Sequence, residues 1–160
     1  MKKIDQIIAH PLFRMSMEKI KTLEAQRRFC CHGITHSLDV ARIAYIRVLE
    51  QGMDYSKEVL YGTALLHDIG RWQQYTEGIP HHEASKELAE RILEDTDFDD
   101  NEKKQILEGI RCHRSLEEAW DDSFAAVIYE ADKQSRICWL CEAYEDCYWP
   151  DERKNRSITR

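Results

Sequence analysis

The sequence predicts an all-α, single-domain protein. Apolar residues recur at helical spacing along nearly the whole chain, and the alternation of β-branched residues that is typical of strands is absent. Glycine (6) and proline (3) are sparse in the 160 residues, so few positions force a helix to break. A chain of this length fits one domain with its own hydrophobic core.

Turn-forming residues divide this pattern into separate helices. His10-Pro11 ends the first one, because the residue before a proline avoids the helical conformation. Gly52 and Gly70 follow two further helices at the position where glycine commonly ends a helix. The segment 71–80 carries glycine and proline, and we expect a loop there. The expected helices are 2–9, 12–28, 34–50, 55–69, 82–95, 100–113 and 122–147.

These helices predict a bundle of six to seven helices over residues 1–150, followed by a polar C-terminal tail over 151–160. The net charge of −7 argues against a nucleic-acid polymer as partner, since such proteins usually present a basic stripe. A small anionic substrate remains compatible with this charge, because a metal ion and local cations dominate at short range. No apolar run reaches the ~20 residues that span a bilayer, and the N-terminus lacks the apolar core of a signal peptide. We therefore expect a cytoplasmic protein without a membrane partner; a homodimer stays open.

Six cysteines are present: Cys30, Cys31, Cys112, Cys138, Cys141 and Cys147. Without a signal peptide we expect them to be reduced. Cys138-Trp139-Leu140-Cys141 has the spacing of half a zinc site or of a redox motif, but it lies inside the expected helix 122–147. The adjacent pair Cys30-Cys31 has the wrong spacing to complete such a site. We therefore interpret these cysteines as small core residues.

Metal-competent side chains continue the apolar stripes of four expected helices. His36 lies on one stripe with Val40 and Ile43, which follow at i+4 and i+7. The others are His67 and Asp68 in 55–69, His113 in 100–113 and Asp132 in 122–147. Asp132 lies on the same side of its expected helix as Ala125, Ile128 and Trp139. Four helices are therefore predicted to aim such a group inward.

The two aspartates favour a metal site over ordinary core residues. A neutral histidine is often buried, but an unpaired ionised aspartate costs several kcal/mol or must take up a proton. We find no lysine or arginine at an obviously opposing inward position for Asp68 or Asp132. The pattern therefore predicts a divalent metal ion. Mixed imidazole and carboxylate ligands do not distinguish iron, manganese, cobalt, nickel, zinc or magnesium.

Three short motifs occur in order along the chain: His36-Ser37-Leu38-Asp39-Val40-Ala41, Leu66-His67-Asp68-Ile69-Gly70 and Tyr129-Glu130-Ala131-Asp132-Lys133. Across about residues 28–140 they resemble the successive signatures of the HD superfamily of metal-dependent phosphohydrolases. The resemblance implies an all-α HD domain in which His36, His67, Asp68 and Asp132 hold one metal ion.

Two further segments resemble those that add a second metal ion in some HD branches. Ile110-Arg111-Cys112-His113 supplies His113, and His81-His82-Glu83-Ala84-Ser85 supplies His81 or His82. The offset to Ser85 favours His81, but His82 faces the apolar side of its helix almost as well. This arrangement resembles the dinuclear branches, which include the bacterial diadenosine-tetraphosphate hydrolases. His32, one turn before His36, is expected to face the surface or the substrate.

The resemblance implies that a metal-activated water hydrolyses a phosphoester or phosphoanhydride of a small nucleotide-like substrate. Asp68 would bridge two ions ~3.5–4 Å apart, and Asp132 would orient the water, which makes both aspartates catalytic. The cations expected to contact phosphate are Arg71, Lys133, Arg136 and Arg114. Two alternatives stay open: a diiron oxygenase on the HD scaffold, and a non-enzymatic metal-dependent ligand sensor.

Overall fold

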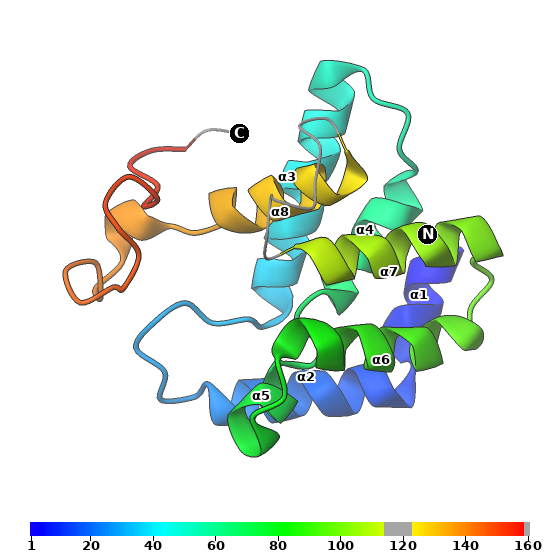
Figure 1. Ribbon diagram of the computed structural model, residues 1–160, viewed down its shortest axis with the longest axis horizontal. Coiled ribbons are helices and arrows are strands. Elements are labelled where there is room, and N and C mark those ends of the chain that lie inside the picture. Colours follow the sequence, from blue (N-terminus) through cyan, green and yellow to red (C-terminus); the bar gives the residue numbers. More distant parts are fainter. Residues whose placement is uncertain (114–122, 159–160) are drawn as a thin grey trace.

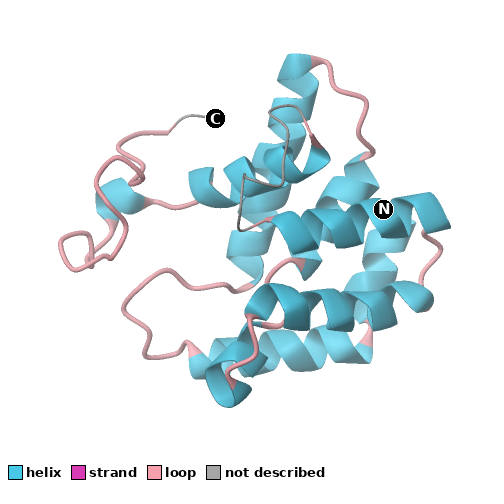
Figure 2. Cartoon of the chain, viewed as in Figure 1, coloured by secondary structure: helices cyan, strands magenta, loops and turns pink. Residues whose placement is uncertain are grey.

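A computed structural model describes residues 1–113 and 123–158 of the chain (Figure 1). The ordered elements of this part are all helices, and no strand occurs in it (Figure 2). The all-α prediction is therefore confirmed. The α-helices are α1 (Lys2–Ala9), α2 (Pro11–Leu23), α3 (Ile34–Gln51), α4 (Lys57–Leu66), α5 (Arg71–Glu77), α6 (His81–Glu94), α7 (Asp100–Cys112) and α8 (Phe124–Gln134).

Local signals explain where several of these helices begin and end. Pro11 occupies the first turn of α2, and Nδ1 of His10 accepts a hydrogen bond from the backbone N–H of Leu12 at 3.1 Å. Asp99 and Glu102 form a reciprocal capping box at the start of α7. Gly52 ends α3 in the left-handed conformation, with φ of 63°.

Segment 71–80 was predicted as a loop, and this prediction is wrong. It contains α5, which lies between Gly70 and a left-handed Gly78 with φ of 74°. The two glycines lie at the two ends of a short helix and do not interrupt it. Glycine is unfavourable mainly in the interior of a helix and is common just past its end. The backbone N–H of Gly70 donates to Oγ of Ser85 at 2.9 Å, which ties the start of α5 to α6.

The predicted helices 12–28 and 122–147 are too long. The observed helix α2 ends at Leu23, and α8 ends at Gln134, so Trp139 does not share a helix with Asp132. Beyond α8 only a single 3₁₀ turn follows, at Cys138–Leu140. Leu140 is 78% exposed, so the apolar spacing after Gln134 does not correspond to a buried helix face.

The helices that carry the metal-competent side chains surround one apolar core. α3 packs against α4 and α8, α4 packs against α7, and α6 packs against α5 and α7. Gly109 permits the close approach of α7, because an added Cβ would lie 2.8 Å from side-chain atoms of Thr63 and Phe124. None of the helices in the described ranges is both long and apolar enough to cross a bilayer.

Candidate metal centre

The His67-Asp68 dipeptide lies next to two residues that are distant from it in the sequence, His36 and Asp132. This pair lies in the turn directly after α4, while His36 comes from the first turn of α3 and Asp132 from the last turn of α8. One ligand atom from each of the four residues lies within 4.8 Å of every other. All four side chains are buried. The structure thus brings together the four residues that the sequence motifs indicated.

A second group shares one of these residues. Ligand atoms of Asp68, His81 and His113 also lie within 4.8 Å of one another, and all three side chains are buried. His82 lies outside both groups, with Nε2 3.9 Å from a carboxylate oxygen of Glu83. The open choice between the two histidines therefore falls to His81. Arg114, an expected phosphate contact, lies outside the described residues.

The four clustered histidines share one orientation. In each ring Nδ1 is committed as a hydrogen-bond donor to a fixed acceptor, so the neutral ring carries its lone pair on Nε2. The acceptors are Oγ of Ser135 for His36 (3.1 Å), the carbonyl of Ala64 for His67 (2.7 Å), Oε1 of Gln74 for His81 (2.7 Å) and the carbonyl of Ile110 for His113 (2.6 Å). All four Nε2 atoms therefore carry the lone pair that a metal ion would bind, and that of His36 faces Nη2 of Arg136 at 3.2 Å.

The donor set fits divalent cations at both groups. Nε2 of His36 lies 3.3 Å from Nε2 of His67, and Nε2 of His81 lies 3.2 Å from Nε2 of His113. Two lone pairs facing each other at this distance repel unless a proton or a cation lies between them. Oδ2 of Asp68 is buried and has no hydrogen-bond partner among the described residues, and Nε2 of His67 lies 3.2 Å from it. A cation bound by these atoms satisfies the orphaned oxygen and relieves the repulsion.

The expectation that no cation opposes the two aspartates is wrong. Nε of Arg71 lies 2.9 Å from Oδ1 of Asp68. Asp132 pairs through Oδ1 with Nη2 of Arg136 at 3.0 Å and through Oδ2 with Nζ of Lys133 at 2.5 Å. Arg71 and Arg136 follow their aspartates by three and four residues, which is the spacing of side-chain pairs on one helical face. This signal was present in the sequence.

Burial and charge act in opposite directions on the pKa values of the cluster. Burial alone would raise the pKa of both aspartates. The charges of His67 and Arg71 nevertheless hold the pKa of Asp68 well below its ordinary value. The close contact of His36 with Asp132 and the charge of Lys133 do the same for the pKa of Asp132. Burial lowers the pKa of His113 to about 4, whereas Asp68 outweighs burial and raises the pKa of His67. Both carboxylates are therefore ionised, as metal ligands must be.

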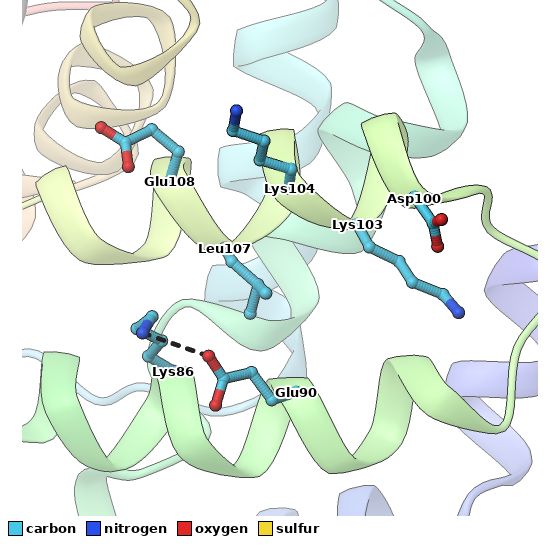
Figure 3. Close-up of a pocket in the computed structure, with 7 residues that line it drawn as sticks. All are labelled: Lys86, Glu90, Asp100, Lys103, Lys104, Leu107 and Glu108. Atoms are coloured by element: carbon cyan, nitrogen blue, oxygen red, sulfur yellow. Dashed lines mark ion pairs between the residues drawn. The ribbon is translucent and has the colours of Figure 1, made fainter.

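A cavity of about 920 Å³ opens onto this cluster. Its polar lining includes the three cations Arg71, Lys133 and Arg136, and its opposite wall comes from the loop before α3 and the segment after α8. A separate, shallower hollow of about 390 Å³ lies between α6 and α7 (Figure 3). That hollow is lined mainly by charged side chains, including the pair of Lys86 and Glu90 at 3.1 Å, and contains no histidine. The metal-competent groups therefore lie at the large cavity.

His32 lines the large cavity without joining either metal-competent group. It is only 4% exposed, so the expectation that it faces the surface is wrong, while a substrate-facing position agrees with its place in the cavity. Its Nδ1 lies 2.5 Å from Oε1 of Glu24, which also accepts a hydrogen bond from the Tyr75 hydroxyl at 2.6 Å. Burial lowers the pKa of His32, and Asp68 opposes this effect. Sequence reasoning missed this network because Glu24 follows the end of α2 and bears no motif.

Comparisons with known proteins agree with this geometry. The family model of the HD domain matches residues 33–137. An uncharacterized protein of Clostridium beijerinckii is 41% identical over 89% of this chain and 88% of its own length. Ribonuclease Y of a Sulfurovum species is 29% identical over 78% of this chain, which spans 23% of that longer protein.

A likeness in fold accompanies the likeness in sequence. The crystal structure of a predicted HD superfamily hydrolase from an uncultured Thermotogales bacterium superimposes with a TM-score of 0.63, covering 89% of this chain and 79% of that one at 21% identity. The match of the family model spans His36, His67, Asp68, His81, His113 and Asp132. This chain belongs to the HD domain family.

Proposed function

We propose that this protein is a metal-dependent phosphohydrolase that uses two metal ions to cleave a phosphoester or phosphoanhydride bond of a small nucleotide-like substrate. The observation that carries the proposal is the position of Asp68. Its carboxylate belongs to both metal-competent groups, as a carboxylate that bridges two ions must. The buried histidines on either side complete two ligand sets.

When bound, the two ions would activate a water molecule and neutralise charge on the phosphoryl oxygens. The side chains of the protein would bind and orient the substrate. Arg71, Lys133 and Arg136 line the cavity next to the aspartates and can donate hydrogen bonds to phosphate oxygens once metal binding releases them from the carboxylates. These local cations support an anionic substrate despite the net charge of −7.

The far wall of the cavity supports a nucleotide in particular. It includes the aromatic side chains of Tyr144, Tyr148 and Trp149, and Tyr129 of α8 also lines the cavity. Tyr148 is 83% exposed, so its ring is free of core packing and accessible to a flat ligand. Aromatic faces of this kind stack on nucleobases. Cations for the phosphates and aromatic rings for the base thus line the same cavity, and Nζ of Lys133 lies 5.9 Å from the ring centroid of Trp149.

His32 is placed to exchange a proton with the substrate. Its Nδ1 is held by Glu24, so Nε2 is the nitrogen left for chemistry at the cavity. A histidine oriented by a carboxylate is a common arrangement for a general acid or base. We infer that His32 accepts a proton through Nε2 as a general base, with Glu24 as its positioning residue.

The test is a panel of nucleotides, dinucleoside polyphosphates, cyclic nucleotides and a short RNA, assayed separately with manganese, iron, cobalt and nickel. The second histidine pair supports the dinuclear branch, so we expect the highest turnover with dinucleoside polyphosphates. The RNA is included because one relative is a ribonuclease. Release of phosphate indicates monoester cleavage, and release of nucleoside monophosphate indicates anhydride cleavage.

Two variants decide whether the activity belongs to this centre. Asp132→Ala should lower kcat/KM by at least about 10²-fold, because it removes a direct ligand. Asp54→Ala, an exposed aspartate in the turn after α3, is the matched control and should retain activity. Hydrolysis that survives Asp132→Ala would refute the proposal. Oxygen-dependent turnover would indicate the oxygenase alternative, and metal-dependent nucleotide binding without turnover would indicate the sensor.

A further inference from the structure

Five of the six cysteines line the wall of the cavity that faces away from the helical core, and all of these except Cys31 are at least partly buried. Cys30 belongs to the loop before α3, and Cys138, Cys141 and Cys147 belong to the segment after α8. All four line the large cavity. In Figure 1 the loop (blue) and the C-terminal segment (orange to red) lie on the same side of the helices. Cys30 is more than a hundred positions from the other three in the sequence, and those three lie in the part of the predicted helix 122–147 that the structure does not form.

The segment after α8 is a run of tight turns. The backbone N–H of Cys141 donates to the carbonyl of Cys138 at 3.1 Å, that of Tyr144 to Cys141 at 3.1 Å, and that of Cys147 to Tyr144 at 3.4 Å. Cys138, Cys141 and Cys147 each stand at one end of such a turn, so the turns keep these three cysteines close together along the segment.

Contacts from the loop before α3 bring Cys30 close to the segment after α8. Nη2 of Arg28 pairs with Oδ2 of Asp146 at 2.7 Å, one residue before Cys147. Nη1 of Arg136 donates to the carbonyl of Cys31 at 3.3 Å. Burial raises the pKa of the Cys30 thiol, and the neighbouring thiols raise it further. Cys30 is thus within electrostatic reach of the other three.

Ordinary packing contributes little to this segment. Ile137 is 56% exposed, and Leu140 and Tyr148 are more exposed still. Ala143 and Cys138 are the buried apolar residues between 137 and 149. A segment with so little buried apolar surface usually owes its shape to cross-links or to a metal. The structure records all six cysteines as free thiols, so no disulfide supplies the link.

We propose that Cys30, Cys138, Cys141 and Cys147 form a second metal site, in which four thiolates hold an iron–sulfur cluster that fixes the C-terminal segment to the loop before α3. Four cysteine ligands suit either zinc or an iron–sulfur cluster. Zn–S bonds of about 2.3 Å would bring the sulfurs to about 3.8 Å from one another. No three of these sulfurs lie mutually within 4.8 Å. The wider spacing favours the larger cluster.

Transfer of a preformed iron–sulfur cluster from a carrier to this site changes no oxidation state. Each of the four thiols releases its proton to solvent, and each resulting thiolate donates a sulfur lone pair to one iron, replacing the carrier ligand on that iron. The site shares its cavity with the HD centre, and Arg136 contacts both the loop carbonyl and Asp132. The cluster would therefore stabilise one wall of the substrate cavity without touching the reacting atoms.

The experiment measures iron, acid-labile sulfide and zinc in the full chain purified without oxygen, together with its visible absorbance. The Asp68→Ala background removes the shared ligand of the HD centre, so iron that remains reports the cysteine site alone. In that background we compare Cys30→Ser and Cys141→Ser with Cys31→Ser. Cys31 is the matched control, because it neighbours Cys30, is exposed and lies outside the proposed set.

We expect about four iron and four sulfide per chain, with a broad visible absorbance, in the Asp68→Ala and Cys31→Ser forms. Cys30→Ser and Cys141→Ser should lose both. If these variants fail to fold, titration of wild-type thiols with an organomercurial should release iron and sulfide together. Zinc with the same cysteine dependence and no sulfide would overturn the cluster as the occupant. Metal content that does not depend on Cys30 or Cys141 would overturn the site itself.

Discussion

Arg136 donates a hydrogen bond from Nη2 to Oδ1 of Asp132 across 3.0 Å. The same nitrogen lies 3.2 Å from Nε2 of His36. The guanidinium therefore occupies the space toward which two metal-ligand atoms point, and it neutralises the carboxylate there. Metal binding and this ion pair compete for the same oxygen, so Arg136 can bind phosphate only after a metal ion has displaced it.

This competition predicts opposite effects on metal and substrate for Arg136→Gln. Metal affinity should increase, because the carboxylate loses its competing cation. KM should rise on the order of tenfold, since a charged hydrogen bond to phosphate is lost. Calorimetric metal titration and steady-state kinetics measure the two effects. Arg42→Gln, an exposed arginine of α3, should change neither; a fall in metal affinity for Arg136→Gln would contradict the competition.

Gln74 positions the second histidine pair, because its Oε1 accepts the Nδ1–H of His81 at 2.7 Å. Gln74→Leu should lower the affinity for a metal ion at Asp68, His81 and His113 by roughly 10–100-fold and leave the affinity at the other group unchanged. The metal content after dialysis should then fall from two ions toward one. Gln73→Leu is the matched control, since its Oε1 is buried and has no hydrogen-bond partner. Equal metal loss from both variants would show that α5 as a whole, rather than this hydrogen bond, is responsible.

Gly70 lies where α5 meets the backbone of α6. A Cβ at this position would lie 2.4 Å from the backbone nitrogen of Ser85 and 2.6 Å from the carbonyl carbon of Ala84. Gly70→Ala should therefore lower the free energy of unfolding by about 1–3 kcal/mol or more and displace His81. Chemical denaturation gives the size of the effect. Gly33→Ala, whose Cβ meets no atom within 4 Å, should cost less, because it changes only the N-cap of α3; an equal loss there would exclude the steric cause.

The histidines predict a pH optimum for the stability of the metal-free protein. The pKa of His67 is raised above 6.5, so its stabilising charge is present below pH 6.5 and is lost as the pH rises through the raised value. Burial lowers the pKa of His113 from 6.5 to about 4, so stability falls as the pH drops from 6.5 toward 4. The Tm of the metal-free chain should thus be highest near pH 6.5.

Bound metal ions should prevent the decrease of the Tm above pH 6.5. Binding requires His67 to release its proton, so the stabilisation by added metal should grow as the pH rises. Thermal unfolding at about pH 5, 6.5 and 8.5, with and without manganese, measures both curves. A Tm that falls equally at high pH in both conditions would mean that the titrating group lies outside the metal centre.

The sequence alone determined the helical class and the four residues of the HD motifs. Both follow from local information. Helical periodicity sets which side of a helix faces the core, and His36 and Asp132 lie on that side of α3 and α8, while the dipeptide His67-Asp68 is buried in the turn directly after α4. Helix ends were predicted where a residue's own backbone preference decides them, as at Gly52. The prediction was wrong after Gln134, because apolar residues at helical spacing do not form a stable helix when no surface packs against them.

Only the tertiary structure decided which distant groups meet. His81 and His82 lie on neighbouring positions of one helix, and the packing of α6 against α5 and α7 buries His81 against His113. The pairing of the aspartates with Arg71 and Arg136, and the gathering of Cys30 with the C-terminal cysteines, likewise depend on contacts between elements. Such contacts arise from the shape of the whole core, which no local pattern of the sequence specifies.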